Sequence, residues 1–215
     1  MELDLVRIPM PSLPGDRRGM FVANAVSLDG LEAARPEHRQ AWLDLLGPIR
    51  GHWDLDRPFR VWKENGRWRT EGVSTCGLVA EGIWRRMSVD LPELYEPYEV
   101  GSAIERAKRY AKQVGAWRTQ GRPRPGDYLI VGTKLKTHAR TVVDWRDGGE
   151  TLISVDGGVP GENGLQSIRL RPTSWKKLGS FIISGGRVVM GWIDVESLRF
   201  SNNEISVPRS ASLVM

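Results

Sequence analysis

Cysteine and histidine are scarce in this chain of 215 residues, which contains one cysteine, Cys76, and three histidines. A single cysteine excludes an internal disulfide and a cysteine-rich metal cluster. The histidines, His38, His52 and His138, are scattered without the spacing of metal ligands. We therefore predict no metal and no other cofactor.

Long apolar runs are also missing. No run approaches the roughly 18–20 apolar residues that a membrane span needs. Residues 1–11 are interrupted by prolines and lack the basic region that opens a usual signal peptide. We expect a protein made in the cytoplasm without a signal peptide, not inserted into a membrane, and exported only by a signal-independent route.

Positive charge is concentrated between residues 104 and 146, where eleven Lys and Arg outnumber three acidic residues. The net charge of the whole chain is +5, so the remainder is slightly acidic. A basic segment of this kind can attract nucleic acid or another polyanion. No nucleic-acid-binding motif accompanies it, so we rank a non-enzymatic basic binding module third and do not expect a nucleic-acid partner.

Helical patterns come before strand patterns along the chain. Helices are predicted within residues 20–46, at 76–87 and at 102–114, and a hairpin is predicted around residues 64–66. The predicted strands that follow are 128–131, 137–145, 151–156, 167–171, 180–184 and 187–195. This order indicates an α+β fold, with N-terminal helices packed on a C-terminal antiparallel sheet.

The same patterns suggest three parts of the chain. Residues 59–200 form the predicted domain. Residues 1–58 are an N-terminal extension of unknown role that we expect to pack on this domain, and residues 201–215 are a peripheral tail.

Cys76 opens a helical run directly after a Ser74–Thr75 pair. Ser and Thr are favoured at helix N-caps, and a helix N-terminus favours the thiolate form of a cysteine. We predict that Cys76 is a nucleophile whose backbone N–H helps to form an oxyanion hole, and that Ser74 and Thr75 contact substrate. A lone cysteine is more often a small buried hydrophobe, so this prediction depends on the groups brought to it.

A histidine and a carboxylate are predicted on the hairpin that follows. If Trp145 pairs with Thr151 around a five-residue loop, Asp156 lies opposite Arg140, diagonal to His138 and on the same face. We therefore predict His138 as the general base and acid and Asp156 as the residue that orients it.

Two other polar residues were weighed for the orienting role. Asp144 shares the predicted face of His138 but lies about 20 Å from it at strand rise, which is too far. Gln166 is a weaker substitute than Asp156.

These residues, in this order, resemble the papain-like cell-wall amidases of the CHAP and NlpC type. Residues 76–79, Cys-Gly-Leu-Val, are similar to the nucleophile helix of that family. Residues 124–131 are similar to its Pro-Gly-Asp turn and following strand, and 138–143 to its histidine strand. Residues 153–156 are similar to the strand that carries the third polar residue.

The resemblance implies a papain-like cysteine amidase or endopeptidase that uses Cys76, His138 and Asp156 to hydrolyse amide bonds of peptidoglycan peptides. It would act at the cell wall or in a target cell, as an antibacterial effector or a phage-type lysin. An injected effector would have a cognate immunity or delivery protein. The alternative keeps the fold but acts on a protein target, as a deamidase, acyltransferase or isopeptidase.

Overall fold

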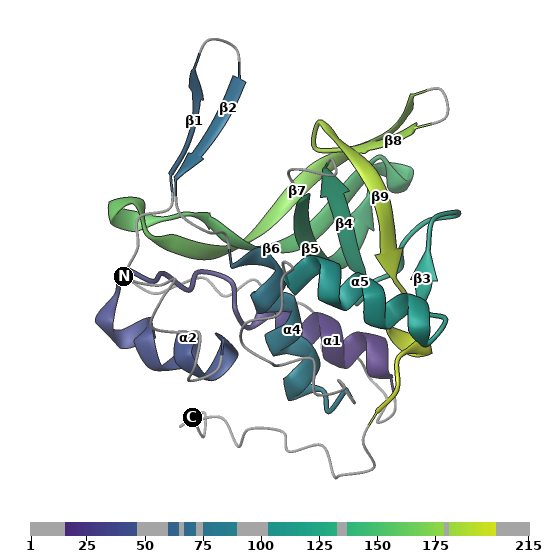
Figure 1. Cartoon of the computed structure of the whole chain (residues 1–215), viewed down its shortest axis with the longest axis horizontal. Helices are drawn as coiled ribbons and strands as arrows, with labels where there is room; N and C mark the ends of the chain where they lie inside the picture. Colours follow the sequence, from purple (N-terminus) through teal and green to yellow (C-terminus); the bar gives the residue numbers. More distant parts are fainter. Residues whose placement is uncertain are drawn as a thin grey trace.

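The computed structural model describes residues 16–46, 60–64, 67–71, 75–89, 103–132, 137–178 and 181–200. The predicted α+β class is confirmed, with helices first and an antiparallel sheet second (Figure 1). The sheet closes into a barrel of six strands, a feature that the strand patterns did not predict.

The helices share one hydrophobic core. They are α1 (Arg17–Val26), the short 3-10 helix η1 (Pro36–His38), α2 (Arg39–Leu46), α4 (Cys76–Arg86) and α5 (Ala103–Gln113). In α4 every residue from Cys76 to Trp84 is buried, because this helix packs against α1, α2, α5 and the barrel. Its continuous burial makes α4 the central helix of the fold.

The strands form a separate hairpin and the barrel sheet. The hairpin consists of β1 (Arg60–Glu64) and β2 (Arg67–Glu71), and it projects away from the barrel in Figure 1. The other strands are β3 (Trp117–Arg118), β4 (Tyr128–Gly132), β5 (Thr137–Arg146), β6 (Thr151–Pro160), β7 (Gln166–Leu178), β8 (Phe181–Ser184) and β9 (Arg187–Ile193). From β4 to β9 each strand pairs with the next, and β9 pairs back with β4 to close the ring.

The two faces of the barrel sheet have separate cores. Residues that point toward the helices, among them Ala139, Val143 and Val155, join the core of α1, α2, α4 and α5. The residues inside the barrel form a second cluster, which comprises Leu129, Val131, Val142, Leu152, Trp175 and Trp192. Side chains of alternate residues therefore lie either under the helices or inside the barrel.

The hairpin of β5 and β6 has a different turn from the predicted one. Thr151 pairs with Arg146 rather than with Trp145, so the connection is one residue shorter. A bulge between Val142 and Asp144 adds one residue to β5 and offsets this change. Beyond the bulge, Arg140 lies opposite Asp156, as predicted.

The bulge reverses the predicted faces near the turn. Trp145 was expected on the same face as Val143, away from His138, but it packs against the cluster inside the barrel, on the opposite face from Val143. Asp144 was expected on the face of His138, but it lies opposite Ile153 and is exposed. Both expectations were wrong because they assumed an unbroken two-residue period.

The described part of the N-terminal segment belongs to the same core as the later helices. Phe21 of α1 and Trp42 of α2 are fully buried in it. Arg18 of α1 forms ion pairs with Asp127, at 2.7 Å, and with Asp194, at 2.5 Å, so α1 is tied to both ends of the barrel sequence. The predicted boundary at residues 58–59 and the predicted tail, 201–215, lie outside the described residues.

None of the helices in the described ranges is long and apolar enough to cross a membrane.

Candidate active site

Cys76 is the first residue of α4, and its side chain is buried with 4% of the residue exposed. The preceding residue, Thr75, fixes this end of the helix. Its backbone N–H and its hydroxyl both donate to Oε1 of Gln166 on β7, over 2.8 Å each. Its carbonyl accepts the N–H of Val79 in the first turn, at 2.9 Å. The start of α4 is therefore held against the strand that carries Gln166.

Thr75 was predicted to contact substrate. The residue is fully buried and its hydroxyl donates to Gln166, so its contacts in this structure position α4. Its hydroxyl does not cap the helix either, although Thr75 is the N-cap residue. Ser74, the other predicted substrate contact, lies outside the described residues. Gln166 was the weaker candidate for the residue that orients His138. Its side-chain oxygen accepts both hydrogen bonds from Thr75, so it holds the start of α4.

A close approach between α4 and β6 brings the cysteine to the barrel. A Cβ atom on Gly157 would lie 2.4 Å from Cγ2 of Val79, a distance that no side chain at 157 could accept without movement. The register of β6 against β7 also shifts just after Asp156. Glycine at 157 therefore lets the strand of Asp156 pass directly beside the helix of Cys76.

The structure brings Cys76, His138 and Asp156 together from α4, β5 and β6. His138 Nε2 lies 3.1 Å from Asp156 Oδ2, and the ring also hydrogen-bonds with the Cys76 side chain. Because Nε2 faces the carboxylate, Nδ1 is the ring nitrogen that remains for the sulfur. Oδ1 of Asp156 accepts a hydrogen bond of 2.8 Å from Ser154 Oγ.

The pKa directions of His138 and Asp156 agree with a charged pair. Burial lowers the pKa of His138, but the charge of Cys76 and the hydrogen bonds to Asp156 and Cys76 outweigh it and hold this pKa above the ordinary value. Burial raises the pKa of Asp156, but the hydrogen bond to His138 and the charge of Arg140 outweigh it and hold this pKa below the ordinary value. The site therefore favours an imidazolium at His138 beside an ionised Asp156.

Ser154 and Arg140 contact Asp156, and neither residue had a predicted role in the site. Ser154 is fully buried and donates to Oδ1. Arg140 is 4% exposed, with Nε 3.7 Å from the same oxygen and Nη1 donating to Thr173 Oγ1 over 3.1 Å. Side chains alternate between the two faces along β5 and β6, and this alternation placed both residues on the face of His138. The sequence could therefore have predicted that they contact Asp156.

The trio contains the groups that cysteine-based nucleophilic catalysis needs. The thiolate of Cys76 can attack an electrophilic carbon, and His138 can carry a proton. Asp156 fixes the ring orientation and stabilises the imidazolium. The first N–H groups of α4 lack partners within the helix, so they can stabilise negative charge that develops beside the sulfur.

Some cations of the basic segment between residues 104 and 146 form ion pairs. Arg106 is buried and pairs with Glu81 at 3.5 Å. Arg124, which is exposed, pairs with Asp194 at 3.1 Å. At least the charge of Arg106 is therefore not available to a polyanion at the surface.

Within the part of the chain that the structure describes, no group of three or more His, Cys, Asp or Glu side chains is arranged to hold a metal ion. Comparisons with protein-family models, with curated proteins and with solved structures gave no match. The function of this chain therefore has to be inferred from the geometry of its own residues and from the short motifs around them.

Proposed function

We propose that this chain is a cysteine hydrolase that cleaves amide bonds, with Cys76 as nucleophile, His138 as general base and acid, and Asp156 as the residue that orients His138. The observation that carries the proposal is the meeting of these three side chains at the start of α4. The His138–Asp156 contact of 3.1 Å joins two different strands, and the only cysteine of the chain is a hydrogen-bond partner of the same ring.

The catalytic cycle follows from this geometry. The Cys76 sulfur attacks the amide carbonyl carbon, and the carbonyl electrons move to an oxygen stabilised by N–H groups at the start of α4. His138 gives its Nδ1 proton to the leaving nitrogen as the C–N bond breaks, which leaves a thioester. Water then attacks the thioester while His138 takes its proton, and the acid product and the thiolate are released.

The short motifs around the trio supply the substrate class. The cysteine helix, the Pro-Gly-Asp turn and the two following strands resemble papain-like cell-wall amidases, so we propose a papain-like arrangement and the amide bonds of peptidoglycan peptides as substrate. An enzyme of this kind would be delivered to the cell wall or to a target cell, and its producer would need a cognate immunity protein.

The test is digestion of purified peptidoglycan with the wild type, Cys76→Ala and Cys76→Ser, followed by mass spectrometry of the soluble fragments. We expect new fragments from the wild type alone, and their masses identify the bond that is cut. The serine variant is the matched control because it keeps the shape of the side chain but weakens the nucleophile. Equal fragments from all three proteins would reject Cys76 as the nucleophile.

If no protein releases fragments, a second measurement separates the substrate from the chemistry. The rate of Cys76 alkylation by iodoacetamide at neutral pH is compared with that of the chain unfolded in urea. Faster alkylation in the folded chain keeps the hydrolase and moves the search to glutamine side chains of proteins. A rate no faster than that of the unfolded chain rejects the hydrolase.

A further inference from the structure

Four arginines lie on the face of the barrel sheet that carries Asp156, and one of them, Arg169 opposite Asp156 on β7, pairs with Glu32. Arg140 is opposite Asp156, and Arg171 of β7 is opposite Ser154, whose side chain binds Asp156. Directly opposed residues of antiparallel strands point to the same face, so Arg171 shares the face of Asp156. These two arginines come from the strands on either side of β6.

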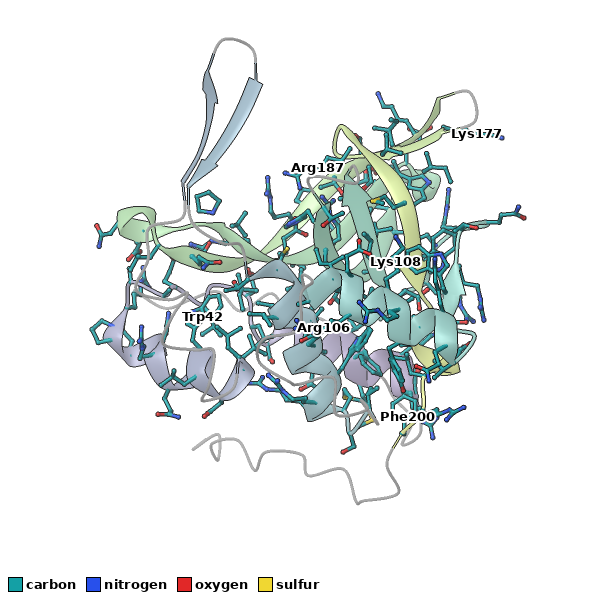
Figure 2. All side chains as sticks on the ribbon, viewed as in Figure 1. Trp42, Arg106, Lys108, Lys177, Arg187 and Phe200 are labelled. Carbon is teal, nitrogen blue, oxygen red and sulfur yellow. The ribbon has the colours of Figure 1, made fainter. Side chains whose placement is uncertain are left out.

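Arg187 joins them through the closure of the barrel. It lies opposite Ser184 at the start of β9, and Ser184 lies opposite Trp175, which packs inside the barrel. The β8–β9 turn is close to Arg140, since a Cβ on Gly185 would be 3.8 Å from Arg140 Nη1. Figure 2 shows Arg187 near this turn.

Arg140, Arg171 and Arg187 are incompletely neutralised, whereas Arg169 pairs with Glu32. Arg140 is more than nine-tenths buried, yet its Nε has no hydrogen-bond acceptor, and Asp156 Oδ1 is 3.7 Å away. Arg171 and Arg187 are exposed, and neither forms an ion pair with another residue that the structure describes. Asp156, already shared with His138, therefore neutralises Arg140 only in part, while Arg171 and Arg187 have no ion-pair partner among the described residues.

The charges are close enough to act on one another and on the nucleophile. Burial lowers the pKa of Arg140, the charge of Asp156 raises it, and the charges of Arg187 and Arg171 lower it further. The charge of Cys76 acts on Arg140 as well, in the raising direction. A thiolate at Cys76 and an imidazolium at His138 would neutralise each other, so Arg171 and Arg187 would leave excess positive charge around the nucleophile.

We propose that Arg171 and Arg187, backed by the buried charge of Arg140, form an anion subsite that binds a carboxylate of the substrate next to the scissile amide. This inference rests on the proposed function and narrows it. The substrate class becomes a peptide in which a residue at the scissile bond carries a free carboxylate, as in an isopeptide link or at a chain end. Guanidinium groups suit this ligand because they bind carboxylates through paired hydrogen bonds.

The test uses two alkylating probes of nearly equal size, iodoacetate and iodoacetamide. In both reactions the Cys76 thiolate attacks the methylene carbon, an S–C bond forms and iodide leaves, so no other reactant is needed. Cys76 is the only cysteine, so mass spectrometry of the intact chain gives both rates. Their ratio cancels any change in the thiolate fraction and isolates the effect of the carboxylate.

The ratio is measured for the wild type, Arg171→Gln, Arg187→Gln and a matched control, Arg146→Gln. Arg146 is exposed at the far end of β5, about 20 Å from Arg140 at strand rise. We expect each subsite variant to lower the ratio of the iodoacetate rate to the iodoacetamide rate about fivefold. This is the size expected when one favourable interaction between partly screened charges a few ångströms apart is lost. The control should match the wild type, and 0.5 M salt should lower the wild-type ratio.

The outcomes separate the two proposals. Alkylation by both probes with the same ratio in all four proteins would overturn the anion subsite and leave the hydrolase intact. Failure of both probes to react with the folded chain would overturn both proposals, because the thiol would then be closed to any substrate. A lower ratio in the two subsite variants alone supports the subsite.

Discussion

Replacing Asp156 by Asn tests the buried charge arrangement at the centre of the site. The substitution keeps the size of the side chain and removes its charge. Asp156 is 1% exposed and Arg140 is 4% exposed. The guanidinium would therefore lose the only carboxylate that the described residues bring within ion-pair distance of it, in a place that water hardly reaches. Breaking a buried ion pair by removing one partner costs about 3–5 kcal/mol. We expect Asp156→Asn to lower the free energy of unfolding by this amount at pH 6.

The assay is urea unfolding followed by tryptophan fluorescence, with Arg140→Gln and the double variant completing a cycle. The free energy of unfolding should fall less in the double variant than the sum of its falls in the two single variants. The difference, which is the coupling energy, should be at least about 1 kcal/mol. Ser154→Ala is the control, since it removes one neutral donor to Oδ1 and keeps every charge. Its expected cost is about 1 kcal/mol.

The pH dependence gives this prediction a second test. The pKa of Asp156 is lowered in the fold, so its stabilisation is present above its ordinary pKa of 3.8 and is lost as pH falls through the lower, folded value. The pKa of His138 is raised, so its stabilisation is present below its ordinary pKa of 6.5 and is lost as pH rises through the higher, folded value. The difference between wild type and Asp156→Asn should therefore be largest between these two ordinary values. A difference below about 0.5 kcal/mol, or one that does not change with pH, would refute the reasoning, because such values are usual for surface substitutions.

Three further predictions concern the framework and the proton carrier. Arg18→Ala should cost about 3–5 kcal/mol in urea unfolding, because it removes the ion-pair partner of the buried Asp127 and one of the partners of Asp194, which keeps Arg118 and Arg124. Arg35→Ala, which breaks an exposed pair, should cost under about 1 kcal/mol, and equal losses would contradict this. Gly157→Ala should lower the free energy of unfolding by about 1–3 kcal/mol, because the added methyl group overpacks against Val79. It should also slow the alkylation of Cys76, and an unchanged rate would show that the close approach of β6 to α4 does not determine the position of Cys76. The rate of hydrolysis should fall at high pH as His138 loses its proton. Asp156→Asn should shift this fall to lower pH, because it removes a hydrogen bond and a charge that raise the pKa of His138. An unshifted pH profile would show that another group causes the fall.

Local patterns predicted most of the elements but not their closure. Helix starts and hairpin turns depend on neighbouring residues, so the helix at Cys76 and the two-residue turn at Gly185 and Gly186 were readable from the sequence. The pairing of β9 with β4 joins segments that are far apart along the chain. No local pattern encodes such a contact, so the antiparallel sheet was predicted without its closure.

The predicted meeting of His138 and Asp156 depended on two errors that offset each other. The connection after β5 is one residue shorter than assumed, and the bulge near Val143 adds one residue to β5. Had only one of them occurred, Asp156 would point to the helix side of the sheet. The contact of Cys76 with this pair was predicted only from residue order, because the fit of α4 on β6 depends on the packing of Gly157 against a side chain of the helix.

The closed ring has a consequence for the order in which the chain assembles. Pairing of β4 with β5, β5 with β6 and so on to β9 closes only short loops, while pairing of β9 with β4 closes the long segment between them. We expect the hairpin that carries His138 and Asp156 to form early and the β4–β9 pairing to form last. The nucleophile and its proton carrier thus need only one hairpin and one helix, whereas Arg187 reaches them only when the ring is complete. Selection of a charged substrate would then be the last property that the folding chain acquires.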